Sequence, residues 1–176
     1  MHAEPLAIRE NSCNVLELCL IVVTENYACG RALSTRIAQE RNMSAENKQK
    51  IEGLYEAFGR GDIPYIIGAL DADIEWWEAE NFIYADKNPY RGPESVLMGV
   101  FGRIMAQWEG FTVTPEEVLD AGDTVVGRGY YAGKYRQTGR DVRAQFAHVF
   151  KIRNGKVVKF QQYTDTAQFL QATTST

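Results

Sequence analysis

The chain has 176 residues, of which 45% are hydrophobic and 24% charged. This length suits one well-buried core with a terminal extension and is short for two domains. Nineteen lysines and arginines stand against 23 acidic residues, a formal net charge of -4 without a basic block. That balance argues against a nucleic-acid-binding surface and favours a small molecule or a protein as partner.

Residues 1–43 are expected to lie outside the domain, as a poorly ordered extension or the product of an upstream start. The apolar run from Val15 to Val23 contains Glu17, is shorter than the roughly 20 residues that span a bilayer, and follows no basic segment. We therefore expect neither a membrane span nor a secretory signal. All three cysteines fall in this extension, and their spacings match no zinc or redox motif, which favours a reducing cytoplasm.

The domain itself is expected over residues 44–172, with a short tail at 173–176. Its first element should be a helix over roughly 45–59, because Ser44 is a suitable N-cap and apolar side chains then recur at spacings of three and four. These side chains are Ile51, Leu54, Tyr55 and Phe58. A second short helix is expected after Asp62, which can cap it.

A strand is predicted at 73–78 and an irregular loop at 79–91, and loops of this length often cover or shape a site. Pro93 marks the start of a helix that should run to about Trp108. Three or four strands follow, joined by glycine-containing turns, at about 111–120, 123–135, 142–153 and 156–164.

The last hairpin has two possible registers, and a one-residue slip would move every side chain to the other face. Phe146, His148 and Phe150 alternate with more polar residues before the turn at Asn154-Gly155. A two-residue turn would put Lys159 on the face of Phe150. A type I turn with Gly155 in a G1 bulge is favoured, because it puts apolar residues and one amide there instead: Val158, Phe160 and Gln162.

Helices followed by antiparallel strands predict an α+β domain, with helices packed on one face of a curved sheet. In the strand at 123–135, three glycines share a face with Tyr131 and Tyr135, which leaves hollow positions between aromatic walls. They are Gly127, Gly129 and Gly133. The sequence leaves open whether this face points inward.

Five short motifs occur in order across residues 44–172: FGRGD at 58–62, DIEWW at 73–77, YRGPE at 90–94, HVFKIRNGKV at 148–157 and YTDTA at 163–167. In this order and spacing the chain resembles the SnoaL-like, ketosteroid-isomerase-related families of the nuclear transport factor 2-like superfamily. The resemblance implies a cone-shaped α+β barrel with a mainly antiparallel sheet, no cofactor and a homodimer. This superfold hosts isomerases, cyclases, hydrolases, dehydratases and noncatalytic binding modules.

Carried over residue by residue, the resemblance is partial. Glu78 looks like the general-base carboxylate of ketosteroid isomerases. Their oxyanion-hole tyrosine falls at Leu54, and Tyr55 is turned from it by about 100° on a helix. The acid-base aspartate of SnoaL-like cyclases falls at Gln162, which cannot transfer protons at neutral pH. His148 resembles the strand histidine of that group.

We predict Glu78 and His148 as catalytic residues. His148 could instead be a hydrogen-bonded core histidine, and Glu78 a solvated acid at a strand end. The predicted substrate-binding residues are Tyr55, Trp76, Tyr131, Phe146, Phe160 and Gln162. Asp165 is expected to cap a C-terminal helix. No metal site is predicted, because two histidines and dispersed cysteines do not supply a ligand set.

The favoured function is cofactor-free acid-base chemistry on a hydrophobic carbonyl compound, as in an isomerase or cyclase, in a cytoplasmic protein. The alternative is a noncatalytic ligand-binding or dimeric assembly module of the same fold. A homodimer would form through the outer sheet face, where Val149, Val157 and Tyr163 are the expected apolar positions.

Overall fold

The computed structural model describes residues 15–175 of the chain. The chain divides into two units, one up to Gln39 and one from Glu40 onward. Helix α1 (Val15–Gly59) begins in the first unit and ends in the second. The expected helix start at Ser44 is therefore wrong. The helix continues through this position because residues 31–43 contain no proline or glycine that would break it. The Ser44 hydroxyl instead donates to the Asp120 carboxylate.

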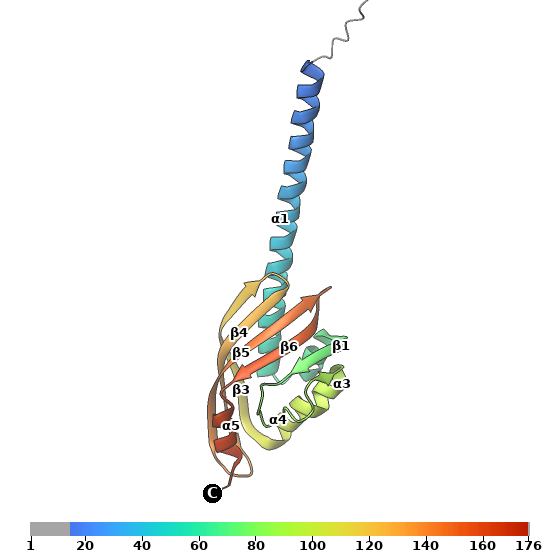
Figure 1. The fold of residues 1–176 in the computed structure, drawn as a ribbon. Coiled ribbons are helices and arrows are strands. Elements are labelled where there is room, and N and C mark those ends of the chain that lie inside the picture. Colours follow the sequence, from blue (N-terminus) through green and yellow to red (C-terminus); the bar gives the residue numbers. More distant parts are fainter. Residues whose placement is uncertain (1–14, 176) are drawn as a thin grey trace, which may run out of the picture. The chain divides into compact units, whose positions relative to one another are not determined.

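The second unit contains a six-stranded sheet in the order β2-β1-β6-β5-β4-β3 (Figure 1). All neighbouring strands are antiparallel except β1 and β6, which are parallel. The α+β prediction is confirmed, but the sheet is not closed into a barrel, since β2 and β3 are its edges. The strands are β1 (Leu70–Trp77), β2 (Tyr90–Arg91), β3 (Trp108–Ala121), β4 (Thr124–Tyr135), β5 (Asp141–Arg153) and β6 (Lys156–Thr164).

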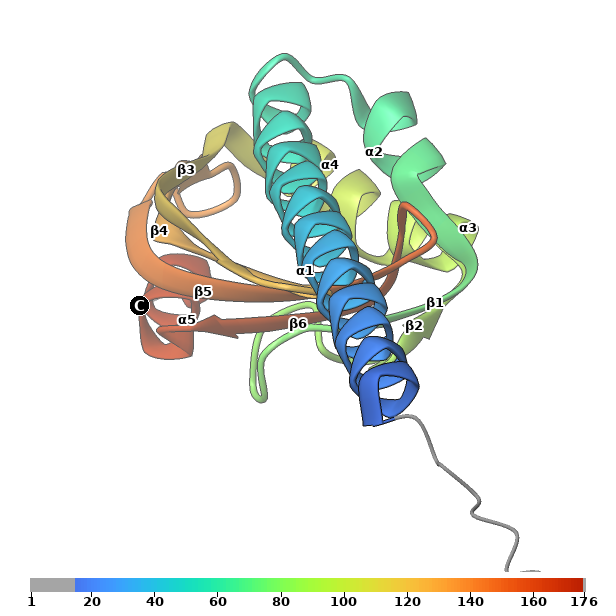
Figure 2. The ribbon, with the colours of Figure 1, turned by 90° about the horizontal axis from the view of Figure 1, so that it is seen from above.

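Short helices cover the sheet, and Figure 2 shows α2, α3 and α4 together on one side of the curved strands. The predicted helix after Gly92 is present, but one turn of it is a π-helix. Asp62 and Asp165 cap α2 and α5 as expected, accepting hydrogen bonds from backbone N–H groups in the first turns. The elements are α2 (Ile63–Ala69), α3 (Pro93–Val96), the π-helical η1 (Leu97–Phe101), α4 (Gly102–Gln107) and α5 (Thr166–Thr173).

The last hairpin has the favoured register but reaches it by a different turn. Phe150 pairs with Phe160, and His148 with Gln162, so these side chains share the buried face. Asn154 and Gly155 both have positive φ, as in a two-residue type I′ turn, and the extra residue lies further along β6. That shift buries Val157, 0% exposed, so its assignment to the outer face was wrong. It also moves Val158, expected inside, off the core face, where it is half-buried.

The glycine-bearing face of β4 points inward, which answers the question that the sequence leaves open. Gly127, Gly129 and Tyr131 are buried along this face. Tyr131 packs its ring against Phe146 and Phe169, at centroid distances of 4.7 and 5.7 Å. The core of the second unit therefore lies between α1 and the concave face of β4, β5 and β6. In the described part of the chain, no helix has the length and apolar character of a membrane span.

Candidate functional site

A cavity of about 70 Å³ lies in this core between helices and sheet. It brings together seven of the eight sequence-predicted site residues: Tyr55, Trp76, Glu78, Tyr131, His148, Phe160 and Gln162. Phe146 does not line it and stacks instead on the His148 ring, with centroids 4.1 Å apart. The remaining walls are apolar, so a ligand would meet hydrocarbon on most sides. They are Leu54, Phe58, Ile66, Phe82, Val100, Phe101, Ile104, Phe111, Val113 and Phe150.

Glu78 directly follows β1 and is 2% exposed. Its Oε1 accepts a hydrogen bond from the Trp76 indole N–H at 2.6 Å. Its Oε2 is buried and has no hydrogen-bond partner among the residues that the structure describes. Burial raises the pKa of Glu78 to about 7, and the Trp76 hydrogen bond partly opposes that rise. A solvated acid at a strand end, the alternative drawn from the sequence, does not describe this side chain.

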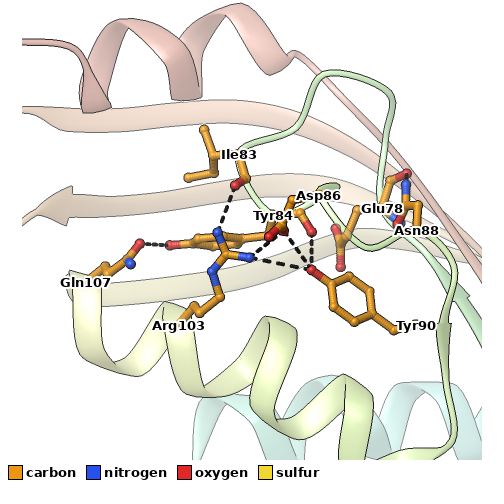
Figure 3. Close-up of polar contacts among 8 residues, drawn as sticks. All are labelled: Glu78, Ile83, Tyr84, Asp86, Asn88, Tyr90, Arg103 and Gln107. Atoms are coloured by element: carbon orange, nitrogen blue, oxygen red, sulfur yellow. Dashed lines mark hydrogen bonds and ion pairs between the residues drawn. The ribbon is translucent and has the colours of Figure 1, made fainter.

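Asn88 fixes the backbone of Glu78 (Figure 3). Its Oδ1 accepts the Glu78 N–H at 2.9 Å, and its Nδ2 donates to the Glu78 carbonyl at 2.7 Å. The amide thus replaces a neighbouring strand at the point where β1 ends and satisfies both backbone groups of the carboxylate-bearing residue. Sequence reasoning missed Asn88, because residues in an irregular loop show no periodicity from which a direction can be inferred.

His148 is buried between two tyrosines. Its Nδ1 lies 3.0 Å from the Tyr55 hydroxyl oxygen, and its Nε2 makes a short contact with the Tyr131 hydroxyl oxygen. Burial lowers the pKa of His148 to about 3, so the ring is neutral at physiological pH. Burial also raises the pKa of both tyrosines above the ordinary value. The histidine is therefore a hydrogen-bonding group here and a weak base.

Gln162 continues this chain of hydrogen bonds. Its Oε1 accepts the backbone N–H of Ala79 at 3.1 Å, and its Nε2 donates to the Tyr131 oxygen at 2.9 Å. Because a backbone N–H can only donate, the orientation of the amide is fixed by this contact. Gln162 therefore links the residue that follows Glu78 to the Tyr131–His148–Tyr55 group.

Gly127 of β4 leaves the space through which Tyr55 of α1 reaches His148 of β5. Gly127 pairs with His148 across β4 and β5. A Cβ at position 127 would lie 2.1 Å from the Tyr55 hydroxyl oxygen and 2.8 Å from the ring carbon that bears it. Only glycine leaves the space that this hydroxyl occupies. The row of glycines in β4 was the sequence signal for such a hollow, but the tyrosine that fills it could not be identified from that pattern.

The loop at 79–89 is attached to α4 through Arg103 (Figure 3). The guanidinium donates to Asp86 Oδ1 at 2.5 Å and to the Ile83 carbonyl at 3.2 Å. It also lies 4.4 Å from the ring centroid of Tyr84. Tyr90 donates from the other side to the Tyr84 carbonyl at 2.6 Å. Since Phe82 of this loop lines the cavity, the attachment holds one wall of the site.

The described residues contain no group of three or more His, Cys, Asp or Glu side chains placed to hold a metal ion. Apart from Glu78 Oε2, every side-chain N and O atom of the cavity-lining residues bonds to another protein group. The site thus offers one free carboxylate oxygen in an apolar space whose lining also includes a hydrogen-bonded tyrosine and histidine.

Comparison with known proteins matches a family model, the SnoaL-like domain, to residues 51–160. A nuclear transport factor 2-like protein from Burkholderia thailandensis is 36% identical, with a TM-score of 0.70, and the match covers 73% of this chain and 98% of that one. A similar protein from Burkholderia pseudomallei is 26% identical, with a TM-score of 0.68 and coverages of 74% and 98%.

The same fold occurs in IdmH, a candidate polyketide cyclase from Streptomyces antibioticus. IdmH is 23% identical, with a TM-score of 0.61, and the match covers 72% of this chain and 96% of IdmH. At this identity the likeness concerns the fold alone. A comparison with curated proteins finds no match.

Proposed function

Because the chain belongs to the SnoaL-like family, we propose that it binds a hydrophobic carbonyl compound in this cavity and catalyses proton transfer next to the carbonyl. The observation that carries the proposal is the buried carboxylate of Glu78, with one oxygen held by Trp76 and the other unpartnered in an apolar cavity. A carboxylate with a pKa near 7 is well suited to act as a general base at neutral pH.

In the proposed step, Glu78 Oε2 takes a proton from the carbon next to the carbonyl. The electron pair of that C–H bond moves into the carbonyl group, and an enolate oxygen results. Tyr131 supplies a hydroxyl in the cavity wall that can donate to this oxygen, supported by Gln162 and His148. His148 itself, with a pKa of about 3, is too weak a base to share the role of Glu78.

IdmH, which shares this fold, is a candidate polyketide cyclase, and cyclisation is therefore considered beside isomerisation. Isomerisation and cyclisation both begin with the proposed step, and the shape of the bound compound decides between them. The noncatalytic alternative is supported by one observation: the cavity hydroxyls, imidazole and amide already bond to one another. In a binding module these groups would only shape the cavity, and none of them would need to donate to a ligand.

The test follows deuterium exchange next to the carbonyl in small cyclic and aromatic ketones, incubated with the protein in D₂O and read by proton NMR. Glu78→Gln should slow exchange by roughly 10²- to 10⁴-fold, the usual contribution of a general base. Glu80→Gln is the matched control, because Glu80 is exposed two residues away. Ketones that bind but exchange equally fast in both variants and the parent would refute catalysis and leave the binding module.

A further inference from the structure

The contacts around His148 leave only two ways to place the hydrogens. A neutral imidazole carries one N–H and one bare nitrogen. Each ring nitrogen faces a tyrosine oxygen, so the ring must donate to one tyrosine and accept from the other. Tyr131 also accepts from Gln162, whose amide is oriented by the Ala79 N–H. The phenol oxygen of Tyr131 can take this second hydrogen bond in either case.

In the first arrangement, His148 donates from Nε2 to Tyr131 and accepts at Nδ1 from Tyr55. The hydrogen of the Tyr131 hydroxyl is then free to point toward a ligand. In the second arrangement, Tyr131 donates to Nε2, and Nδ1 donates to Tyr55. The hydrogen of the Tyr55 hydroxyl is then the free one. The two arrangements differ only in where the protons sit along hydrogen bonds that already exist.

Tyr55 connects the cavity with the surface. The residue lines the cavity and also borders a surface depression of about 410 Å³. Its hydroxyl lies against Gly127, which pairs with Val118 of that depression. Four acidic residues also line this depression: Glu52, Glu56, Glu116 and Glu117.

From this geometry we infer that Tyr131, His148 and Tyr55 form a proton relay between the cavity and the surface depression. The inference rests on the proposed function, because the relay supplies the proton that the enolate oxygen takes up. The cavity-facing O–H bond of Tyr131 breaks and its proton bonds to the enolate oxygen. The Nε2 proton of His148 moves to Tyr131, and the Tyr55 proton moves to Nδ1. Tyr55 recovers a proton from water, which leaves as hydroxide.

Each passage therefore delivers one proton and converts the first arrangement into the second. Passage in the opposite direction restores the first arrangement, with a proton leaving through Tyr55. No oxidant, reductant or further reactant is needed. Gln162 is a positioning residue in this scheme: its amide bonds to Tyr131 and cannot itself transfer a proton.

The relay can be tested in the full-length protein without any ligand. The chain has only two histidines, His2 and His148, so the ring N–H signals in protein labelled with ¹⁵N-histidine are assigned by comparison with His2→Gln. Exchange of the His148 ring hydrogen with water is measured by saturation transfer. Tyr55→Phe removes the outer hydroxyl, and Gly127→Ala displaces it by introducing a Cβ into its space. Tyr130→Phe, next to Tyr131 in β4, is the matched control.

A relay predicts that exchange is at least tenfold slower in Tyr55→Phe and in Gly127→Ala, and unchanged in Tyr130→Phe. A purely structural role predicts the opposite sign, because loss of a hydrogen bond would loosen the ring and speed its exchange. Unchanged or faster exchange in both variants overturns the relay. The parent alone gives a second criterion: ring exchange as slow as that of the protected β5 amides would also overturn it. Because no ketone is used, this result is independent of the test of Glu78 as a base.

Discussion

Two buried titratable groups of the same cavity are shifted in opposite directions, and both shifts have the same cause. Burial disfavours the charged form, so it raises the pKa of Glu78 to about 7 and lowers that of His148 to about 3. Each residue is thereby neutral over a wide range of pH. Of these two residues, only Glu78 has a pKa close to neutral pH and is therefore suited to act as a general base there.

Removal of the Trp76 N–H should raise the pKa of Glu78 while leaving its carboxylate in place. This hydrogen bond lowers the pKa of Glu78 against the effect of burial. In Trp76→Phe we expect the pKa of Glu78 to rise further above 7, measured by carbon-13 NMR of the carboxyl group. The rising limb of exchange rate against pH should move to higher pH by the same amount. A pKa at or below that of the parent would show that the indole does not act on the carboxylate.

His148 should stay neutral well below its ordinary titration range. With a pKa lowered to about 3, its ring carbon signals should show no titration between pH 8 and pH 5. His2 provides an internal comparison in the same spectra. A midpoint near 6.5 for His148 would contradict the burial of the ring between two tyrosines.

Most of the single-residue placements that could be predicted followed from strand periodicity. Alternation placed His148 and Gln162 on the inward face, and β1 placed Glu78 on the face of Trp76. The pairing of His148 with two tyrosines was not predictable, because it joins three elements whose packing angles the sequence does not encode locally. Asn88 was missed for a related reason, since its role depends on the path of a loop.

The loop at 79–89 shows how one element positions a site on another. Asn88 holds the backbone of Glu78, and Arg103 holds the loop against α4 through Asp86 and the Ile83 carbonyl. The π-helical turn contributes as well, because Gly99 lies where the Tyr90 ring passes; a Cβ there would come within 2.1 Å of that ring. The loop is irregular in backbone but is fixed by specific contacts.

Arg103→Leu should free the loop without replacing any residue that lines the cavity. The variant loses the ion pair with Asp86 and the bond to the Ile83 carbonyl, but the Arg103 side chain is partly exposed. We therefore expect a loss of only about 1 kcal/mol in unfolding free energy. Amides of residues 82–88 should exchange with solvent faster, measured by hydrogen-deuterium exchange, while β5 amides do not change. Arg91→Leu, which removes a surface ion pair with Glu75, is the matched control.

The last hairpin marks the limit of prediction at the scale of elements. Its register was predictable because only one of the two registers keeps Lys159 off the face of Phe150. The turn type was not, since a G1 bulge at the turn and a type I′ turn with a later bulge give the same pairing from Phe150 to Phe160. The strand order was not predicted, because local pattern does not indicate which distant strands pair; the resemblance implied only a mainly antiparallel sheet.

At the scale of the whole molecule, we propose a homodimer formed through the outer face of the sheet. Tyr163 is 58% exposed on β6, and Val149 is half-buried on the neighbouring strand. Light scattering across micromolar concentrations should give twice the 19.9 kDa mass of the chain. Tyr163→Glu should shift the protein toward the monomer by burying a charge in the interface. A monomeric parent at all concentrations would contradict the proposal.

The unfolding free energy of the protein should depend on pH because the carboxylate of Glu78 is buried. Glu78 has an ordinary pKa of 4.5 and a folded pKa of about 7. Between these values the folded state binds more protons than the unfolded state, so unfolding free energy must fall as pH rises. The cost of ionising Glu78 approaches about 3 kcal/mol above pH 7. Glu78→Gln cannot ionise and should escape this cost.

Urea unfolding of parent and Glu78→Gln at pH 5, 6, 7 and 8 tests this expectation. The difference in unfolding free energy should grow in favour of the variant with rising pH and level off above pH 7. His148 contributes in the opposite sense, because its lowered pKa destabilises the folded state as pH falls below 6.5. That contribution is common to both proteins and cancels in the difference. Parallel curves would show that Glu78 ionises freely, and the same finding would remove the basis for its action as a base near neutral pH.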